Sequence, residues 1–314
     1  MVTGTSRMAG LEAGTLSAAL LMTVTWGSSS VATKVGLASY GPGQLTLLRF
    51  IITSSLMVLF ALITRMGLPA RRDILPIACL GLVGISTTQL GFSFGITSVD
   101  PGTATFLVST VPVMTAILAR FWLGEHLSLA GWIGIGLTVI GTVVLVLGQD
   151  EGLAMTRGAL FLLIGAFAEA WYFILQKPFL HRYTSQEVST WSLIAASFPL
   201  LIFFPSLPSQ FQAATFGDTA AVVYAALGAG VIGYFCMTYI NARLPASITA
   251  VLMAGMPPVA LVAAWLWIGV TPPLFSILGG LVSLVGVLLV TLRGRAPVAV
   301  DAPLATGLPL PAVD

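Results

Sequence analysis

Glu169 is the residue of this sequence best placed to do chemistry, because it lies within a continuous apolar run at residues 157–177. It is about 12 residues into that run, or roughly 18 Å along a helix that rises 1.5 Å per residue. With Tyr172 and Gln176 it forms an i, i+3, i+7 stripe, which lies on one helix face. The stripe predicts a cavity wall on which the carboxylate binds a substrate amine or takes up a proton. The alternative is a structural glutamate that hydrogen-bonds between helices.

Two cations and two tryptophans extend this set. Lys34 and Arg49 lie near one end of the first and second apolar runs, where they could anchor an anionic group, contribute to a gate, or simply extend toward lipid headgroups. Trp26 and Trp171 occupy related positions in the two halves of the chain. Together they predict two aromatic walls around an apolar or aromatic group. Packing and interfacial anchoring are the alternatives for each tryptophan.

Further hydrogen-bonding side chains follow helical spacing in the third and eighth runs. Gln89 lies in the third run, and Tyr234 and Asn241 form a stripe in the eighth. They can line the same cavity, or they can join helices to one another, a contact measured at about 0.6 kcal/mol.

Proline interrupts two further runs. Pro112 lies within the fourth and the pair Pro257 and Pro258 within the ninth. Proline removes a backbone donor and clashes with the preceding turn, so each site predicts a kink or local unwinding. Paired breaks in corresponding helices favour hinges beside a substrate site, although tolerated kinks are the alternative.

The elements that hold these residues are transmembrane helices. Only 8% of the residues are charged and 57% are hydrophobic, which excludes an ordinary soluble globule. Runs of this length must be helices, because in lipid the backbone has to satisfy its own hydrogen bonds. The polar breaks predict an all-α integral membrane protein with ten spans, at 14–36, 44–64, 74–97, 101–121, 128–147, 157–177, 186–204, 219–241, 246–268 and 272–292.

An internal repeat organises these spans. Residues 99–147 recur without a gap as residues 244–292, 145 positions later, and Pro112, Trp122, Gly134 and Gly141 are among the residues that match. The halves are therefore 14–147 and 157–292, with five helices each. An odd number of spans makes the second half enter the membrane from the opposite side, so the repeats are inverted. Such halves can exchange conformations and open a central site to alternate sides. The proline-rich tail, residues 293–314, is expected to be disordered and cytoplasmic.

The positive charges predict the orientation. Ten of the 13 lysine and arginine residues fall on one side of the ten-span arrangement, and only Lys34, Arg49 and Arg157 lie toward the other. Because such residues are retained on the cytoplasmic side, both termini are expected in the cytoplasm.

Other classes of function find little support. The two histidines, His126 and His181, lie in predicted loops, and no zinc-spaced cluster or buried pair of aspartates occurs. We therefore expect no enzyme, no metal and no cofactor. The expected partners are a small-molecule substrate and the lipid bilayer, without nucleic acid, and the expected assembly is a monomer or a homodimer.

Several of these residues together resemble the EamA-type domains of the drug/metabolite transporter superfamily. The resemblance rests on Trp26-Gly27-Ser28 with Lys34, on Arg49-Phe50, and on the frame Pro112, Leu123-Gly124-Glu125, Gly134 and Gly141, which the second copy repeats as Pro257, Gly269, Gly279 and Gly286. One departure is Val270, which stands where Glu125 would repeat.

The resemblance implies a ten-helix exporter of metabolites in the bacterial inner membrane. We expect a secondary active transporter of small solutes such as amino acids that works by alternating access, with Glu169 coupling export to the proton gradient. Phosphorylated solutes, with Lys34 and Arg49 as anchors, and drugs are alternative cargoes. A membrane-embedded enzyme is the less favoured alternative of another class.

Overall fold

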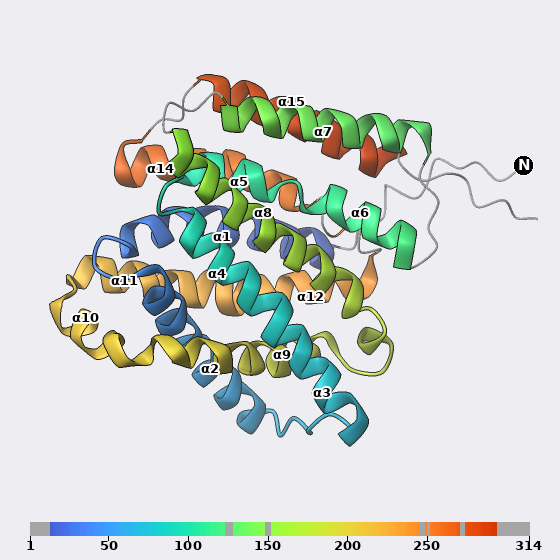
Figure 1. Ribbon diagram of the computed structural model, residues 1–314. Coiled ribbons are helices and arrows are strands. Elements are labelled where there is room, and N and C mark those ends of the chain that lie inside the picture. Colours follow the sequence, from blue (N-terminus) through green and yellow to red (C-terminus); the bar gives the residue numbers. More distant parts are fainter. Residues whose placement is uncertain are drawn as a thin grey trace, which may run out of the picture.

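A computed structural model describes residues 13–122, 128–147, 152–244, 249, 252–270 and 274–293, and over these residues the chain forms helices and no strand (Figure 1). Glu125 and the tail beyond Arg293 lie outside the described residues. The α-helices are α1 (Ala13–Gly36), α2 (Pro42–Ile63), α3 (Arg71–Cys79), α4 (Ser86–Gly95), α5 (Pro101–Val108), α6 (Val111–Trp122), α7 (Leu129–Leu147), α8 (Gly152–Leu175), α9 (Ser185–Leu200), α10 (Leu207–Ala213), α11 (Phe216–Ala225), α12 (Tyr234–Arg243), α14 (Met256–Ile268) and α15 (Leu274–Arg293).

Within the described residues these helices form ten membrane-spanning segments. Six segments are long and apolar enough by themselves to cross a hydrocarbon core, namely Pro42–Ile63, Arg71–Gly95, Pro101–Trp122, Arg157–His181, Ser185–Ala213 and Phe216–Arg243. The remaining four are supplied by α1, α7, α14 and α15. The predicted all-helical, ten-span membrane fold is confirmed.

Two composite spans contain π-helical turns at matching places. The π segment η1 (Leu80–Ile85) joins α3 to α4, and η4 (Ala226–Gly233) joins α11 to α12. Both segments are rich in glycine, and a Cβ built on Gly81 would collide with the carbonyl oxygen of Ser192. In η1 the wider turn therefore occurs where another backbone approaches closely, whereas the glycines of η4 face the side chains of Thr25, Thr53 and Trp26.

The predicted proline breaks also fall at matching places. Ser109 and Thr110 separate α5 from α6, and Pro112 lies in the first turn of α6. Pro257 and Pro258 lie in the first turn of α14, directly after a 3₁₀ turn, η5 (Met253–Gly255). A proline in the first helical turn loses no intrahelical hydrogen bond, which explains why each helix restarts there. Movement about these breaks stays a prediction.

The peripheral pair α7 and α15 shows the symmetry between the halves most directly (Figure 1). A Cβ built on Gly141 would lie 2.6 Å from the carbonyl oxygen of Gly279. One built on Gly286 would lie 2.5 Å from the carbonyl oxygen of Gly134. The second contact is the first with each glycine replaced by its repeat equivalent, Gly141 by Gly286 and Gly279 by Gly134. Such reciprocal contacts are characteristic of a two-fold interface. With five spans in each half, the two repeats are inverted.

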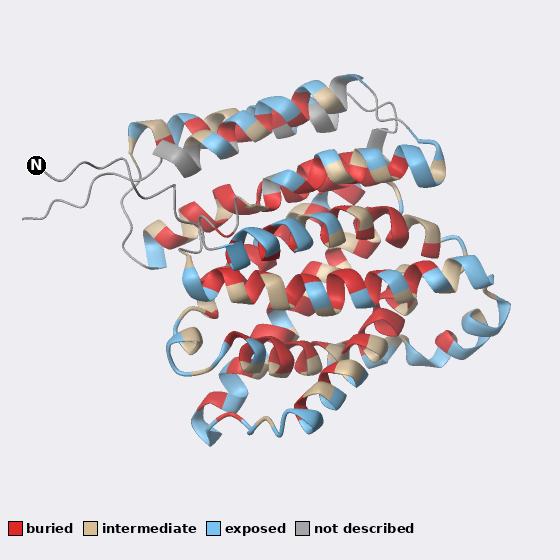
Figure 2. Cartoon of the chain, turned by 180° about the vertical axis from the view of Figure 1, so that it is seen from behind, coloured by how far each residue is buried: buried red, intermediate tan, exposed pale blue. Residues whose placement is uncertain are grey.

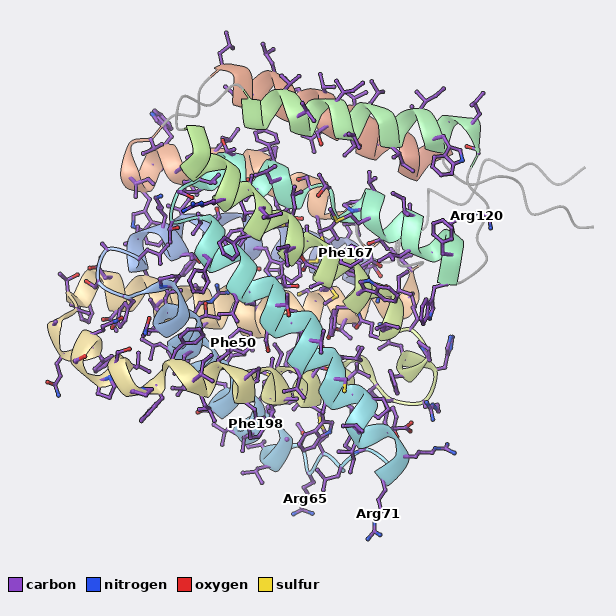
Figure 3. All side chains as sticks on the ribbon, viewed as in Figure 1. Phe50, Arg65, Arg71, Arg120, Phe167 and Phe198 are labelled. Atoms are coloured by element: carbon purple, nitrogen blue, oxygen red, sulfur yellow. The ribbon has the colours of Figure 1, made fainter. Side chains whose placement is uncertain are left out.

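The first helix of each half packs against the other half. Helix α1 contacts α11, α12 and α14, whereas α8 contacts α4, α5 and α6. Helices α2 and α9 pack on each other. Buried residues are concentrated along the faces of these inner helices (Figure 2). Phe50 is buried, whereas Phe167 and Phe198 are exposed on the outer surface of the bundle, as expected of residues that face lipid (Figure 3).

Candidate functional site

A small cavity lies between the two halves. Its volume is about 50 Å³, which holds a few water molecules at most. Helices from both repeats supply its walls, which include Trp26, Ser29, Arg49, Thr88, Gln89, Phe92, Val108, Leu162, Gly165, Glu169, Met253 and Met256. Val108, Met253 and Met256 lie directly before or at the proline breaks, so the interrupted spans form part of the cavity wall.

Glu169 and Arg49 are ionisable groups that face this cavity without hydrogen-bond or ion-pair partners among the described residues. Glu169 on α8 is 5% exposed and Arg49 on α2 is 3% exposed. Among the described residues, neither side chain forms a hydrogen bond or an ion pair, and Arg49 Nε is completely buried. Burial of an unpaired charge is costly, so groups of this kind are expected to meet a complementary partner during function. Of the two predicted cations, only Arg49 reaches the cavity.

An aromatic and amide cluster forms another wall. Trp26 Nε1 donates to the carbonyl oxygen of Ala229 at 3.0 Å, and its ring meets Tyr234 edge-on with the ring centroids 5.3 Å apart. Gln89 Nε2 donates to Tyr234 Oη at 3.1 Å. The structure therefore brings together Trp26, Gln89 and Tyr234, of which Trp26 and Gln89 line the cavity and Tyr234 packs against them.

Trp171 lies away from this cluster, and the predicted pair of aromatic walls is not formed. Its ring packs on Trp122, with the centroids 4.9 Å apart, in an apolar groove of about 750 Å³ between η1, α4 and α8. We attribute this to a change in repeat register, because Lys34 and Lys177, near the ends of α1 and α8, are 143 positions apart and make matching contacts. Helices α2 and α9 begin at Pro42 and Ser185, 143 positions apart, whereas the later spans keep an offset of 145. With an offset of 143 positions the counterpart of Trp26 is Glu169. Trp171 lies two residues further along the helix, so it points about 200° away from Glu169 around the helix axis.

A line of buried polar groups leads from Glu169 toward the end of α8. We call Tyr172, Gln176, Ser192, Thr238 and Asn241 the polar seam. Of the eight completely buried polar atoms that lack a hydrogen-bond partner among the described residues, five belong to these side chains.

The contacts inside the polar seam are incomplete. The hydroxyls of Ser192 and Thr238 lie beside Tyr172 Oη without forming a hydrogen bond of regular geometry. Gln176 Nε2 contacts the sulfur of Met237 at 3.6 Å, and Asn241 Nδ2 donates to the carbonyl oxygen of Phe173 at 3.3 Å, while both amide oxygens stay unpaired. Each unsatisfied group costs about 1–3 kcal/mol. The seam would thus be stabilised by water if it opened.

Lys34 lies at the edge of the protein rather than in the cavity. Its Nζ donates to the carbonyl oxygens of Ile96 at 2.8 Å and Thr97 at 3.3 Å, at the end of α4. At the opposite end of the bundle Lys177 Nζ donates to the carbonyl oxygens of Asn241 and Leu244, at the end of α12. Lys177 was not among the predicted site residues. Its position 143 residues after Lys34 is the signal that could have identified it.

Comparison with known proteins gives a consistent picture. The EamA-like transporter family matches residues 14–147 and 156–292. The uncharacterized transporter YdfC of Bacillus subtilis is 33% identical, over 85% of this chain and 87% of that protein. A probable terminal-alkyne amino-acid exporter of Streptantibioticus cattleyicolor is also 33% identical, over 88% and 93% of the two chains. A protein crystal structure has the same fold, with a TM-score of 0.66 at 19% identity, and the match covers 90% of this chain and 98% of that one.

Proposed function

Because this chain belongs to the EamA-like transporter family, we propose that it is a secondary transporter that exports a small zwitterionic solute of the amino-acid class by alternating access. The observation that carries the proposal is the opposition of charges in one cavity. Glu169 comes from the second half, Arg49 comes from the first half, and both lack partners among the described residues.

The two charges suit the two ends of an amino acid. The Arg49 guanidinium can bind a carboxylate through charge-assisted hydrogen bonds, and the Glu169 carboxylate can accept from an ammonium group. Trp26, Phe92 and Met256 then surround the side chain of the solute. Bound in this way, one ligand neutralises both buried charges. The relative named as an amino-acid exporter supports the same substrate class.

The size and position of the cavity support alternating access. At about 50 Å³ it is too small for an amino acid. A solute can enter only if the halves separate at one end, and it can leave only if they separate at the other. Inverted repeats provide these two arrangements, because each half can adopt the conformation of its partner.

The proposed location is the bacterial inner membrane, with both termini in the cytoplasm. In Figure 3 Arg71 and Arg120 lie toward the same end of the bundle. Arg182 also belongs to this end, through its contact with Asp73 in the first turn of α3. Positive residues accumulate on the cytoplasmic side, so this end is the proposed cytoplasmic face.

A phosphorylated solute is the weaker alternative. A phosphate group carries up to two negative charges and is usually bound by several cations. Arg49 is the cation that lines the cavity, while Lys34 is engaged with backbone carbonyl groups at the edge of the bundle.

The experiment is a thermal-shift screen of the detergent-purified protein against amino acids, nucleobases, amines and sugar phosphates. A ligand at 100 times its Kd stabilises the folded state by about 2.7 kcal/mol. We expect an amino acid to raise the unfolding temperature and to drive counterflow in vesicles that contain the protein. Arg49→Met should abolish both effects, and Arg71→Gln, which removes an exposed cation, should leave both intact. Stabilisation by sugar phosphates but not by amino acids would refute the proposed substrate class.

A further inference from the structure

At one end of the bundle a buried aspartate ties the two halves together. Asp73 lies in the first turn of α3 and is 4% exposed. It accepts hydrogen bonds from Arg182 Nη1 at 3.0 Å and from Tyr183 Oη at 2.7 Å. Both donors lie in the connection between α8 and α9, in the other half. We call this set the Asp73 latch.

At the opposite end a second aspartate makes a corresponding contact. Asp218 lies in the first turn of α11 and accepts a hydrogen bond from Ser39 Oγ at 2.5 Å. Beside it, the hydroxyls of Tyr40 and Thr219 are 2.8 Å apart. Ser39 and Tyr40 lie in the connection between α1 and α2, again in the other half. We call this set the Asp218 latch.

The two latches are equivalent under the repeat. Asp218 follows Asp73 by the 145 positions that relate the later spans, and α3 and α11 begin with the same offset. Tyr183 follows Tyr40, and Arg182 follows Ser39, by the 143 positions that relate α2 to α9.

The lysine contacts obey the same two offsets. Lys177 follows Lys34 by 143 positions, and their respective acceptors Asn241 and Ile96 are 145 positions apart. Thus the aspartate and the lysine at one end have counterparts in matching contacts at the other end, and Tyr40 corresponds to Tyr183 in position but contacts Thr219, the residue next to the aspartate. A two-fold relationship of the halves produces such reciprocal pairs, whereas unrelated loop contacts would not.

We propose that the Asp73 latch and the Asp218 latch are two copies of one gate, and that transport requires them to open one at a time. This inference rests on the proposed alternating access. Both latches are closed here and the cavity between them is small, so the structure corresponds to the occluded state.

The Asp73 latch closes the end that contains the polar seam. Gln176 and Asn241 lie near the ends of α8 and α12, on the same side as Lys177 and Arg182. When this latch opens, water reaches the unpaired oxygens of the seam, which offsets the loss of the latch contacts. Opening at the Asp73 end therefore gives a hydrated path to Glu169.

The test measures access to the cavity from each side of the membrane. In a background with Cys79→Ala and Cys236→Ala, Ser29→Cys places a thiol in the cavity wall. Oriented vesicles of each polarity are then treated with a membrane-impermeant thiol reagent. Asp73→Ala should raise the labelling rate from the Asp73 side by about tenfold or more, because the lost contacts are hydrogen bonds to a charged group. The rate from the other side should not rise.

Asp218→Ala is the matched variant and should give the reverse result. Tyr183→Phe and Tyr40→Phe remove only a hydroxyl from each latch, and they should show the same side preferences with smaller increases if an aspartate variant fails to fold. Equal increases from both sides, or no increase in any variant, would overturn the proposal. Labelling needs no substrate, so a protein that labels as expected but moves no amino acid refutes the proposed function alone. Normal transport with unchanged labelling refutes the latches alone.

Discussion

Gln89 Nε2 donates to Tyr234 Oη at 3.1 Å, and these two residues are exact repeat equivalents, 145 positions apart. Two equivalent residues that touch must lie beside the axis that relates the halves. The axis therefore passes through the wall of the cavity, where the charged groups of both halves converge.

We expect Gln89 and Tyr234 to be energetically coupled. Tyr234→Phe leaves the half-buried Gln89 amide without its acceptor and should lower stability by about 0.5–1.5 kcal/mol. Adding Gln89→Leu removes the unpaired group, so the double variant should lose less than the two single variants combined. Thermal unfolding of the four proteins in detergent measures this coupling, and strictly additive losses would contradict it.

Glu169→Gln should weaken ligand binding without lowering the stability of the folded protein. The unfolding temperature without ligand should stay the same or rise, because an amide is less costly to bury than an unpaired carboxylate. The affinity for an amino acid should fall by about tenfold or more, since charge-assisted hydrogen bonds contribute about 1.5–3 kcal/mol. Ligand titrations followed by thermal shift measure both effects.

Glu187→Gln is the matched control for this variant. Glu187 completes the capping box at the start of α9, a role that glutamine can also perform. It should therefore change neither quantity. A large loss of unfolding temperature in Glu169→Gln would instead support a structural role for Glu169.

The sequence predicted which segments are helices and which residues share a polar face. It predicted less well toward which neighbour each face points, because that depends on the rotation of the helix about its own axis. Glu169 and Arg49 were identified because charges within apolar runs are costly, and both line the cavity. Trp171 was misplaced because the repeat offset of 145 was read from the later spans, whereas the contacts of Lys34 and Lys177 relate the first helices of the halves by 143 positions. The rotation of a helix about its own axis depends on packing against its neighbours, which spacing along one chain does not record.

The latch residues were missed for a different physical reason. Asp73 and Asp218 lie near helix starts, where acidic residues are ordinarily explained by the helix dipole. Their partners lie in connections more than 100 residues away in sequence. Only the three-dimensional contacts show that the two ends match.

Trp26 and Trp171 should differ in their effect on ligand binding. Trp26→Phe removes the donor to the Ala229 carbonyl and part of the cavity wall, so we expect a several-fold weaker affinity for the solute. Trp171→Phe changes only the outer groove and should leave the affinity unchanged. Binding isotherms of the two variants test the assignment, and an equal loss in both would restore the symmetrical arrangement of two aromatic walls.

The interface between α7 and α15 should tolerate no additional carbon atom at its close contacts. A Cβ on Gly141 would lie 2.4 Å from the backbone nitrogen of Ser283, and neither backbone can move without separating the helices. Gly141→Ala should therefore destabilise the protein by about 1–3 kcal/mol, the usual cost of overpacking. Gly136→Ala, on the same helix, meets no atom within 4 Å and is the matched control. It should raise the unfolding temperature slightly, because alanine is the better helix former.

Because the contact is reciprocal, Gly286→Ala should destabilise the protein as much as Gly141→Ala. An unchanged unfolding temperature in Gly286→Ala would contradict the two-fold packing of this pair.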